Sequence, residues 1–105
     1  MRILFDQGTP APLRRALVKH AVSTAYERGW SELNNGDLLQ AAEDAFDVFI
    51  TADRSLRYQQ NLSGRKLAML VLPTTSWPRI RERVAAVVGA LEALRPGDVV
   101  ELTFE

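Results

Sequence analysis

The stretch DVFITADRSLRYQQNL, residues 47–62, decides how this chain folds. Its first part, DVFITA, carries a continuous apolar run of the kind found in strands that are covered on both faces of a parallel sheet. The run stops at Asp53, and arginines, a tyrosine and three consecutive side-chain amides follow. We therefore predict a buried central strand that delivers an aspartate to its carboxyl end.

Further apolar runs lie on both sides of this stretch. ILF at residues 3–5 and LAMLVL at residues 67–72 predict two more buried strands, and residues 21–25 predict another. The final residues, VVELTFE, alternate in polarity as a half-covered edge strand does.

Helical patterns separate these strands. Residues 9–20 predict a helix, because a threonine and a proline suit its cap and first turn and two leucines are spaced four apart. Residues 37–46 predict a short helix with an inner face of leucine and alanine. Residues 77–94 have apolar side chains at helical spacing and predict a long helix. In that helix Gly89 indicates either close packing or a surface for a partner, such as a second copy in a homodimer.

Alternating strands and helices predict a three-layer α/β/α domain over residues 1–105, with a mostly parallel central sheet of about five strands. Thirteen basic residues balance thirteen acidic ones, so no global field attracts nucleic acid or a membrane. The absence of cysteine and the single histidine exclude disulfides, thiolate catalysis and Cys- or His-rich metal sites. No segment approaches the ~20 apolar residues of a membrane span, so we expect a cytoplasmic protein with no membrane partner.

Two aspartates follow predicted strands at equivalent positions: Asp6 after the first strand and Asp53 after the third. Ligands of open parallel sheets bind beyond the carboxyl ends of the strands. If the two strands are neighbours, the carboxylates converge and require a cation or a shared proton. Asp37, at the start of the second predicted helix, is the best candidate for a third acid. Such oxygen ligands suit Mg²⁺ or Mn²⁺, which could activate water for phosphodiester hydrolysis.

Each acid also has a purely structural interpretation. An aspartate after a strand is often a turn former or a helix cap. Asp37 is favourable at a helix start on dipole grounds alone. The pairing of Asp6 with Asp53 on equivalent strand ends favours the functional interpretation.

A basic and polar group surrounds Asp53, with four cations within thirteen residues of a neutral chain. Its arginines and lysine could hold phosphates, its tyrosine could stack on a base, and its amides could contact a ligand or satisfy a turn. The alternative is a solvated surface. The candidate nucleic-acid-binding residues are Arg54, Arg57, Tyr58, Gln59, Gln60, Asn61, Arg65 and Lys66.

Three segments, MRILFDQGTP, YERGWSELNNGDLL and DVFITADRSLRYQQNL, together resemble a bacterial and archaeal PIN-like family of unknown function. That family is related to the PIN nucleases, including VapC-type toxins. The resemblance covers residues 1–72 and, more loosely, the rest of the chain. It implies a PIN-like fold with an acidic Mg²⁺ or Mn²⁺ site that hydrolyses phosphodiesters, most often in RNA. By position, Asp6, Asp37 and Asp53 match the catalytic and metal-binding acids.

Two positions depart from the pattern of that family. Many PIN-like relatives carry further acids where this chain has Gln7 and Ser55. Fewer acids lower the negative charge of the site. This favours one metal ion rather than two, or an inactive scaffold.

Three functions therefore stay open. The leading hypothesis is a metal-dependent ribonuclease, which as the toxin of a toxin–antitoxin pair would be held inactive by a small antitoxin protein. The second is a non-catalytic PIN-like interaction module that has lost full metal binding. The third and least favoured is a phospho-acceptor receiver-like domain. Receivers also place aspartates after the first and third strands, but they usually carry paired acids after the first strand and a lysine after the fifth.

Overall fold

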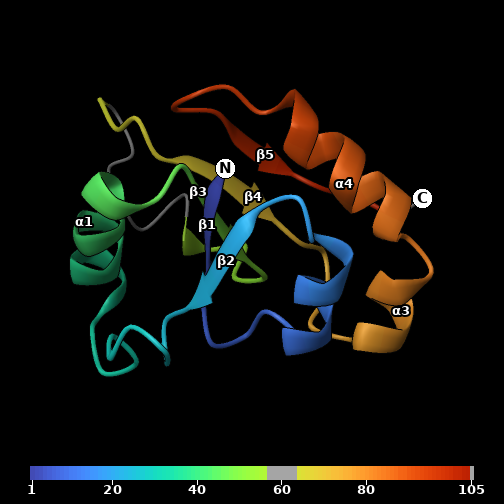
Figure 1. The fold of residues 1–105 in the computed structure, drawn as a ribbon, viewed down its shortest axis with the longest axis horizontal. Coiled ribbons are helices and arrows are strands. Elements are labelled where there is room, and N and C mark those ends of the chain that lie inside the picture. The colour runs from blue at the N-terminus through green and yellow to red at the C-terminus, as the bar shows by residue number, and fades with distance from the viewer. Residues whose placement is uncertain (57–63, 105) are drawn as a thin grey trace.

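The structure, a computed structural model, describes residues 1–56 and 64–104 (Figure 1). Within these residues, five strands form one sheet in the order β2-β1-β3-β4-β5, and all neighbouring strands are parallel. The strands are β1 (Arg2–Phe5), β2 (Ala21–Thr24), β3 (Val48–Thr51), β4 (Ala68–Val71) and β5 (Val99–Glu101). The predicted parallel sheet of about five strands is confirmed.

Helices cover both faces of this sheet (Figure 1). They are the 3₁₀ helix η1 (Ala11–Ala16) and the α-helices α1 (Asn35–Ala45), α3 (Trp77–Arg81) and α4 (Val84–Ala93). Side chains of the strands alternate between two cores. Ile3, Phe5 and Ile50 pack with η1, α3 and α4, whereas Leu4 and Phe49 pack with α1 on the other face. The three-layer α/β arrangement is therefore confirmed.

The segment predicted as a helix over residues 9–20 forms only the short 3₁₀ helix η1. Its backbone N–H groups bond three residues back, from Leu13 to Pro10 and from Leu17 to Arg14. Prolines are tolerated in the first turn of an α-helix, so Pro10 and Pro12 do not by themselves explain the 3₁₀ form. Leu13 and Leu17 are nevertheless both buried, as their spacing predicts.

The long helix predicted over residues 77–94 is divided into α3 and α4. Arg83 leaves the helical conformation at φ −122° and ψ 24°, and both pieces contact η1. The apolar stripe survives the break, because Ile80, Val87 and Leu91 are all buried. Gly89 is exposed, and a Cβ added there would meet no atom within 4 Å, so it does not mark close packing within the chain.

The strand order places the carboxyl ends of β1 and β3 at the point where the chain changes direction across the sheet. In doubly wound sheets of this order, ligands bind in the crevice at this switch point. Asp6 and Asp53 follow these two strands. None of the helices in the described part of the chain is long and apolar enough to cross a membrane.

Candidate functional site

Asp6 is fixed at the carboxyl end of β1 by two buried threonines. Its Oδ1 accepts hydrogen bonds from the backbone N–H of Thr9 at 3.0 Å and from Oγ1 of Thr9 at 2.7 Å. Its Oδ2 accepts a hydrogen bond from Oγ1 of Thr51. The Thr9 hydroxyl also lies 2.8 Å from the carbonyl oxygen of Ile50, so its single proton is shared between two acceptors. These contacts give the Asp6 carboxylate a defined orientation.

Thr51 connects Asp6 with Asp53. It is the last residue of β3 and is completely buried, and its hydroxyl donates to the Asp6 carboxylate. The same hydroxyl oxygen accepts a hydrogen bond from the backbone N–H of Asp53 at 3.0 Å. The two aspartates therefore follow neighbouring strands, which the sequence left open, and Thr51 bonds the carboxylate of Asp6 and the backbone N–H of Asp53.

Asp53 shows the geometry of a turn-forming residue. Its Oδ1 accepts hydrogen bonds from the backbone N–H of Ser55 at 3.0 Å and from Oγ of Ser55 at 2.6 Å. Such local bonds are typical of aspartate at the start of a turn. The side chain of Asp53 is nevertheless exposed, so it can change orientation at little cost.

Asp37 lies in the first turn of α1. The side chain of Asn34 caps this helix by accepting a hydrogen bond from the backbone N–H of Asp37 at 2.8 Å. A cavity of about 200 Å³ separates the start of α1 from Asp6, and Asn35 and Trp30 help to line it. The start of α1 therefore lies beside the carboxyl edge, while Asp37 is exposed.

The three acids are near one edge, but they do not form a preassembled metal site. In the described part of the chain, which includes Asp6, Asp37 and Asp53, no three His, Cys, Asp or Glu side chains are placed to hold a metal ion together. Carboxylate oxygens are suitable ligands for Mg²⁺ or Mn²⁺. To share one ion with Asp6, the exposed side chains of Asp37 and Asp53 must turn toward it.

Sequence reasoning missed the threonines that hold Asp6. Thr9 follows Asp6 by three residues, a spacing at which a hydroxyl and a carboxylate commonly bond within a turn. Thr51 interrupts the apolar run of β3, and a polar residue in a strand buried on both faces signals a required hydrogen bond. Both signals are visible in the sequence.

Of the predicted nucleic-acid-binding residues, the structure describes three, and Arg54 lies apart from Arg65 and Lys66. Arg54 is exposed directly after Asp53. Arg65 and Lys66 precede β4 at the amino edge of the sheet, where the backbone N–H of Lys66 donates to Glu43 at 2.6 Å. The length of the sheet therefore separates these two residues from Asp53. Arg57, Tyr58, Gln59, Gln60 and Asn61 lie outside the residues that the structure describes.

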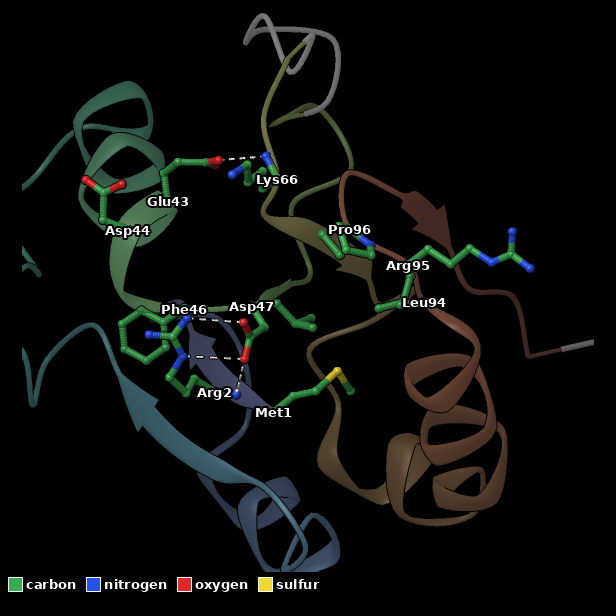
Figure 2. Close-up of a pocket in the computed structure, with 12 residues that line it drawn as sticks. Met1, Arg2, Glu43, Asp44, Phe46, Asp47, Lys66, Leu94, Arg95 and Pro96 are labelled. Carbon is green, nitrogen blue, oxygen red and sulfur yellow. Dashed lines mark hydrogen bonds and ion pairs between the residues drawn. The ribbon is translucent and has the colours of Figure 1, made fainter.

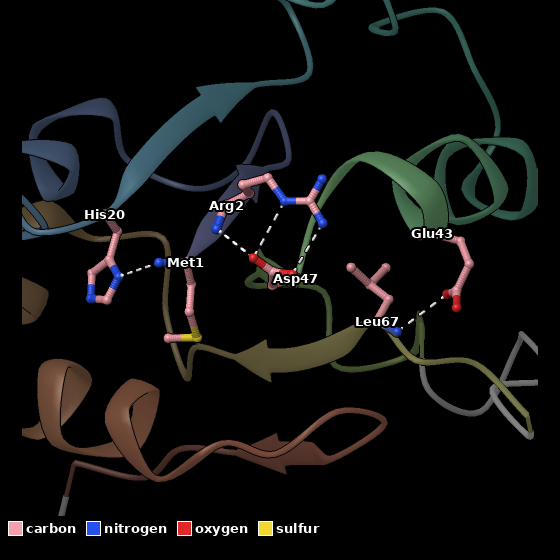
Figure 3. Close-up of polar contacts among 6 residues, drawn as sticks. All are labelled: Met1, Arg2, His20, Glu43, Asp47 and Leu67. Carbon is pink, nitrogen blue, oxygen red and sulfur yellow. Dashed lines mark hydrogen bonds and ion pairs between the residues drawn. The ribbon is translucent and has the colours of Figure 1, made fainter.

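A cavity of about 630 Å³ lies at this amino edge (Figure 2). Asp47 accepts a hydrogen bond from the backbone N–H of Arg2 at 2.7 Å and pairs with its guanidinium (Figure 3). The backbone N–H and then the side chain of Arg2 hold the pKa of Asp47 below its usual value. Glu43 accepts backbone bonds from Lys66 and Leu67. Asp47 and Glu43 are therefore already engaged by partners within the protein.

Comparison of this chain with models of protein families, with curated proteins and with solved structures finds no match in any of the three. The PIN-like resemblance accordingly stays a prediction from the residues.

Proposed function

We propose that this protein is a metal-dependent ribonuclease whose site surrounds Asp6 at the carboxyl edge of the sheet. One observation carries the proposal: Asp6 and Asp53 follow adjacent strands at the switch point and are joined by Thr51. Doubly wound sheets bind their ligands at this position.

The oxygen donors present suit a hard cation. An ionised carboxylate offers about four acceptor positions, and the two threonines supply three donors to Asp6, which leaves capacity for a further ligand. Asp6 would hold Mg²⁺ or Mn²⁺ together with one or both of the exposed acids, Asp37 and Asp53. A bound ion would supply Lewis acidity and activate water for attack on a phosphodiester. The threonines keep the Asp6 carboxylate in place.

Two parts of the proposal rest on the PIN-like resemblance, namely RNA as the substrate and a small antitoxin protein as the partner. The cytoplasm as the location rests on the sequence, which has no run of ~20 apolar residues. If the protein is a toxin, its expression arrests growth of a bacterial host, and the Asp6→Asn variant does not. Arrest by both proteins, or by neither, would contradict the toxin assignment.

A cleavage assay tests the nuclease activity. Labelled single-stranded RNA is incubated with Mn²⁺ and with wild type or the variants Asp6→Asn, Asp37→Asn and Asp53→Asn. Replacing partners around a metal ligand typically costs about 10–100-fold, so we expect loss of the Asp6 ligand itself to cost at least about 100-fold. Asp44→Asn is the matched control, because Asp44 is exposed and lines the cavity at the opposite edge. The proposal fails if wild type cleaves no RNA or if Asp6→Asn cleaves as fast as Asp44→Asn.

The second candidate is a non-catalytic interaction module. The turn bonds between Asp53 and Ser55 favour it, because they give Asp53 a structural role without metal. Thermal melts with and without Mn²⁺ separate the two functions. A ligand at ~100 times its dissociation constant adds ~2.7 kcal/mol, which raises the melting temperature of such a domain by several degrees. A melting temperature that Mn²⁺ does not change favours the module.

The strand order supports the third candidate, since phospho-acceptor receivers share it. The sequence argues against a receiver, because Asp6 is followed by Gln7 rather than by a second acid, and the residues after β5 include no lysine. Incubation with acetyl phosphate decides the matter: a receiver gains the mass of one phosphoryl group at Asp53, and a nuclease does not.

A further inference from the structure

The outer edge of β2 carries a concentration of positive charge in a chain that is neutral overall. Between Arg14 and Arg28 the sequence contains four basic residues and one acidic residue, Glu27. A shallow hollow of about 760 Å³ lies along this edge and is lined by Arg14, Arg15 and Arg28 among others. Arg14, Arg15 and Arg28 therefore face a common surface, and Lys19 lies in the sequence between two residues of its lining, Val18 and His20.

Glu27 does not offset this charge for an incoming ligand, because Arg14 already neutralises it. Both guanidinium Nη atoms of Arg14 bond the Glu27 carboxylate, and the backbone N–H of Thr24 donates to it at 2.9 Å. The Arg14 hydrogen bonds and then the Thr24 backbone lower the pKa of Glu27 to about 2. Arg14 also donates to the carbonyl oxygen of Val22 at 3.0 Å. The pair thus occupies the open edge of β2 and blocks strand pairing there.

Three cations remain available after this pair is formed: Arg15, Lys19 and Arg28. None of them forms an ion pair with an acid within residues 1–56 and 64–104. The guanidinium carbon of Arg28 lies over two aromatic rings, 5.5 Å from the ring centre of Trp30 and 4.7 Å from that of Phe46. These contacts position the Arg28 side chain, and guanidinium donors suit phosphate oxygens.

An exposed aromatic residue lies next in the sequence to Glu27 of the hollow, although it is not part of the lining itself. Tyr26 is 79% exposed, although it follows a buried residue, Ala25, and lies directly before Glu27. Cations beside an exposed ring are the combination with which proteins hold single-stranded nucleic acid, because the cations bind phosphates and the ring stacks on an unpaired base.

The turn after β2 connects this surface to the candidate site. Trp30 and Ser31 line the cavity that also contains Asp6, and the side chain of Gln7 donates to the carbonyl oxygen of Ser31 at 3.2 Å. In Figure 1, β2 runs beside β1, so a ligand on the outer edge of β2 can continue toward the carboxyl end of β1. Arg28 lines the hollow and lies over Trp30, which lines the cavity at Asp6, so this contact connects the two sites.

We infer that the outer edge of β2 binds single-stranded RNA, with phosphates on Arg15, Lys19 and Arg28 and a base stacked on Tyr26. The choice of RNA rests on the proposed function. RNA binding by this surface should not require a metal ion, because none of its residues belongs to the acidic site. RNA binding can therefore be measured when cleavage is prevented.

The test is fluorescence anisotropy of a short labelled single-stranded RNA with wild-type protein in EDTA. Three phosphate contacts predict a slope of about −2 for the logarithm of affinity against the logarithm of salt concentration. The double variant Arg15→Gln, Lys19→Gln should reduce this slope to about −0.7. The matched control is Arg95→Gln, an exposed arginine at the amino edge, which should keep the wild-type slope. If the double variant keeps the wild-type slope and affinity, the inference is overturned.

Two further variants separate charge from stacking. Tyr26→Ala should weaken binding about fivefold or more without changing the salt slope, and Tyr26→Phe should bind as wild type does. Arg28→Gln should reduce the slope by about 0.7, whereas Arg28→Lys keeps the charge and should keep the wild-type slope. Equal affinity for Tyr26→Ala and wild type would contradict the stacked base.

This experiment fails independently of the nuclease assay. If wild type binds RNA through these residues but cleaves none with Mn²⁺, only the nuclease proposal falls. If wild type cleaves RNA while the charge variants bind it normally, only the proposal that the outer edge of β2 binds RNA is contradicted.

Discussion

The two edges of the central sheet use their acidic residues differently. At the amino edge, Asp47 bonds the backbone and side chain of Arg2, and Glu43 bonds two backbone N–H groups that precede β4. At the carboxyl edge, Asp6 is held by threonine hydroxyls, whereas Asp37 and Asp53 are exposed.

This difference separates acids that stabilise the fold from acids that remain available to a ligand. Asp47 and Arg2 are 45 residues apart, so their bond closes a long segment of chain. The bonds of Asp53 reach only two residues along the chain to Ser55. In the absence of metal, substitution of the engaged acids at the amino edge, Asp47 and Glu43, should therefore lower stability, and substitution of the exposed acids at the carboxyl edge should not.

The largest loss of stability is expected from substitution of Thr51, whose hydroxyl forms two hydrogen bonds at the carboxyl edge. Thr51→Val keeps the shape of the side chain but removes a donor from Asp6 and an acceptor from the N–H of Asp53. Each unsatisfied polar group costs about 1–3 kcal/mol when buried, and both are partly solvated here, so we expect the free energy of unfolding to fall by about 2 kcal/mol. Urea denaturation measures this loss. Thr51→Ser retains the hydroxyl and should lose less, and equal losses in the two variants would contradict the role of the hydroxyl.

A smaller effect is expected from Asp47→Asn at the amino edge. The variant removes the charge that pairs with Arg2, but the two side chains are 56% and 43% exposed, so solvent screens much of the interaction. We expect a loss of about 0.5–1 kcal/mol in urea denaturation. Asp44→Asn, also at this edge, should cause no loss. If Asp47→Asn is as stable as Asp44→Asn and wild type, the proposed difference between the two edges is contradicted.

The same pair predicts a dependence of stability on pH. The folded pKa of Asp47 lies below its unfolded value of 3.8, so its contribution is complete above that value. It disappears as the pH falls through the folded pKa. The stability difference between wild type and Asp47→Asn should therefore shrink as the pH falls below about 4. A difference that stays constant down to pH ~2 would show that ionisation of Asp47 does not contribute.

The smallest effect is expected at Asp37. Its carboxylate is exposed, and the capping bond to Asn34 uses its backbone N–H rather than its side chain. Asp37→Asn should change the free energy of unfolding by less than about 0.5 kcal/mol without metal, even with the loss of a favourable charge at the helix start. A loss above 1 kcal/mol would place Asp37 among the acids that stabilise the fold.

Local patterns predicted the sheet well because burial on both faces leaves a continuous apolar run in each central strand. The ends of β1 and β3 could be predicted for the same reason, and with them the positions of Asp6 and Asp53. The 3₁₀ form of η1 has no clear signal in the sequence, because prolines in a first turn are equally compatible with an α-helix. The break at Arg83 has no signal either, because the apolar stripe continues through it.

The grouping of site residues was harder to predict because closeness in sequence is not closeness in space. Arg65 and Lys66 follow Asp53 by about a dozen residues, yet the chain has returned to the opposite edge of the sheet before they occur. The pair of Arg14 and Glu27 joins residues from either side of β2, and no spacing rule connects them. Such contacts depend on how loops close, which the apolar pattern does not encode.

The central claim is that the acids of the carboxyl edge bind a divalent cation through Asp6. Titration calorimetry of Mn²⁺ into wild type, Asp6→Asn and Asp47→Asn tests it most directly. We predict that wild type and Asp47→Asn bind Mn²⁺ with the same affinity and that Asp6→Asn does not bind it. Absence of binding in wild type, or equal binding by Asp6→Asn, would contradict the account.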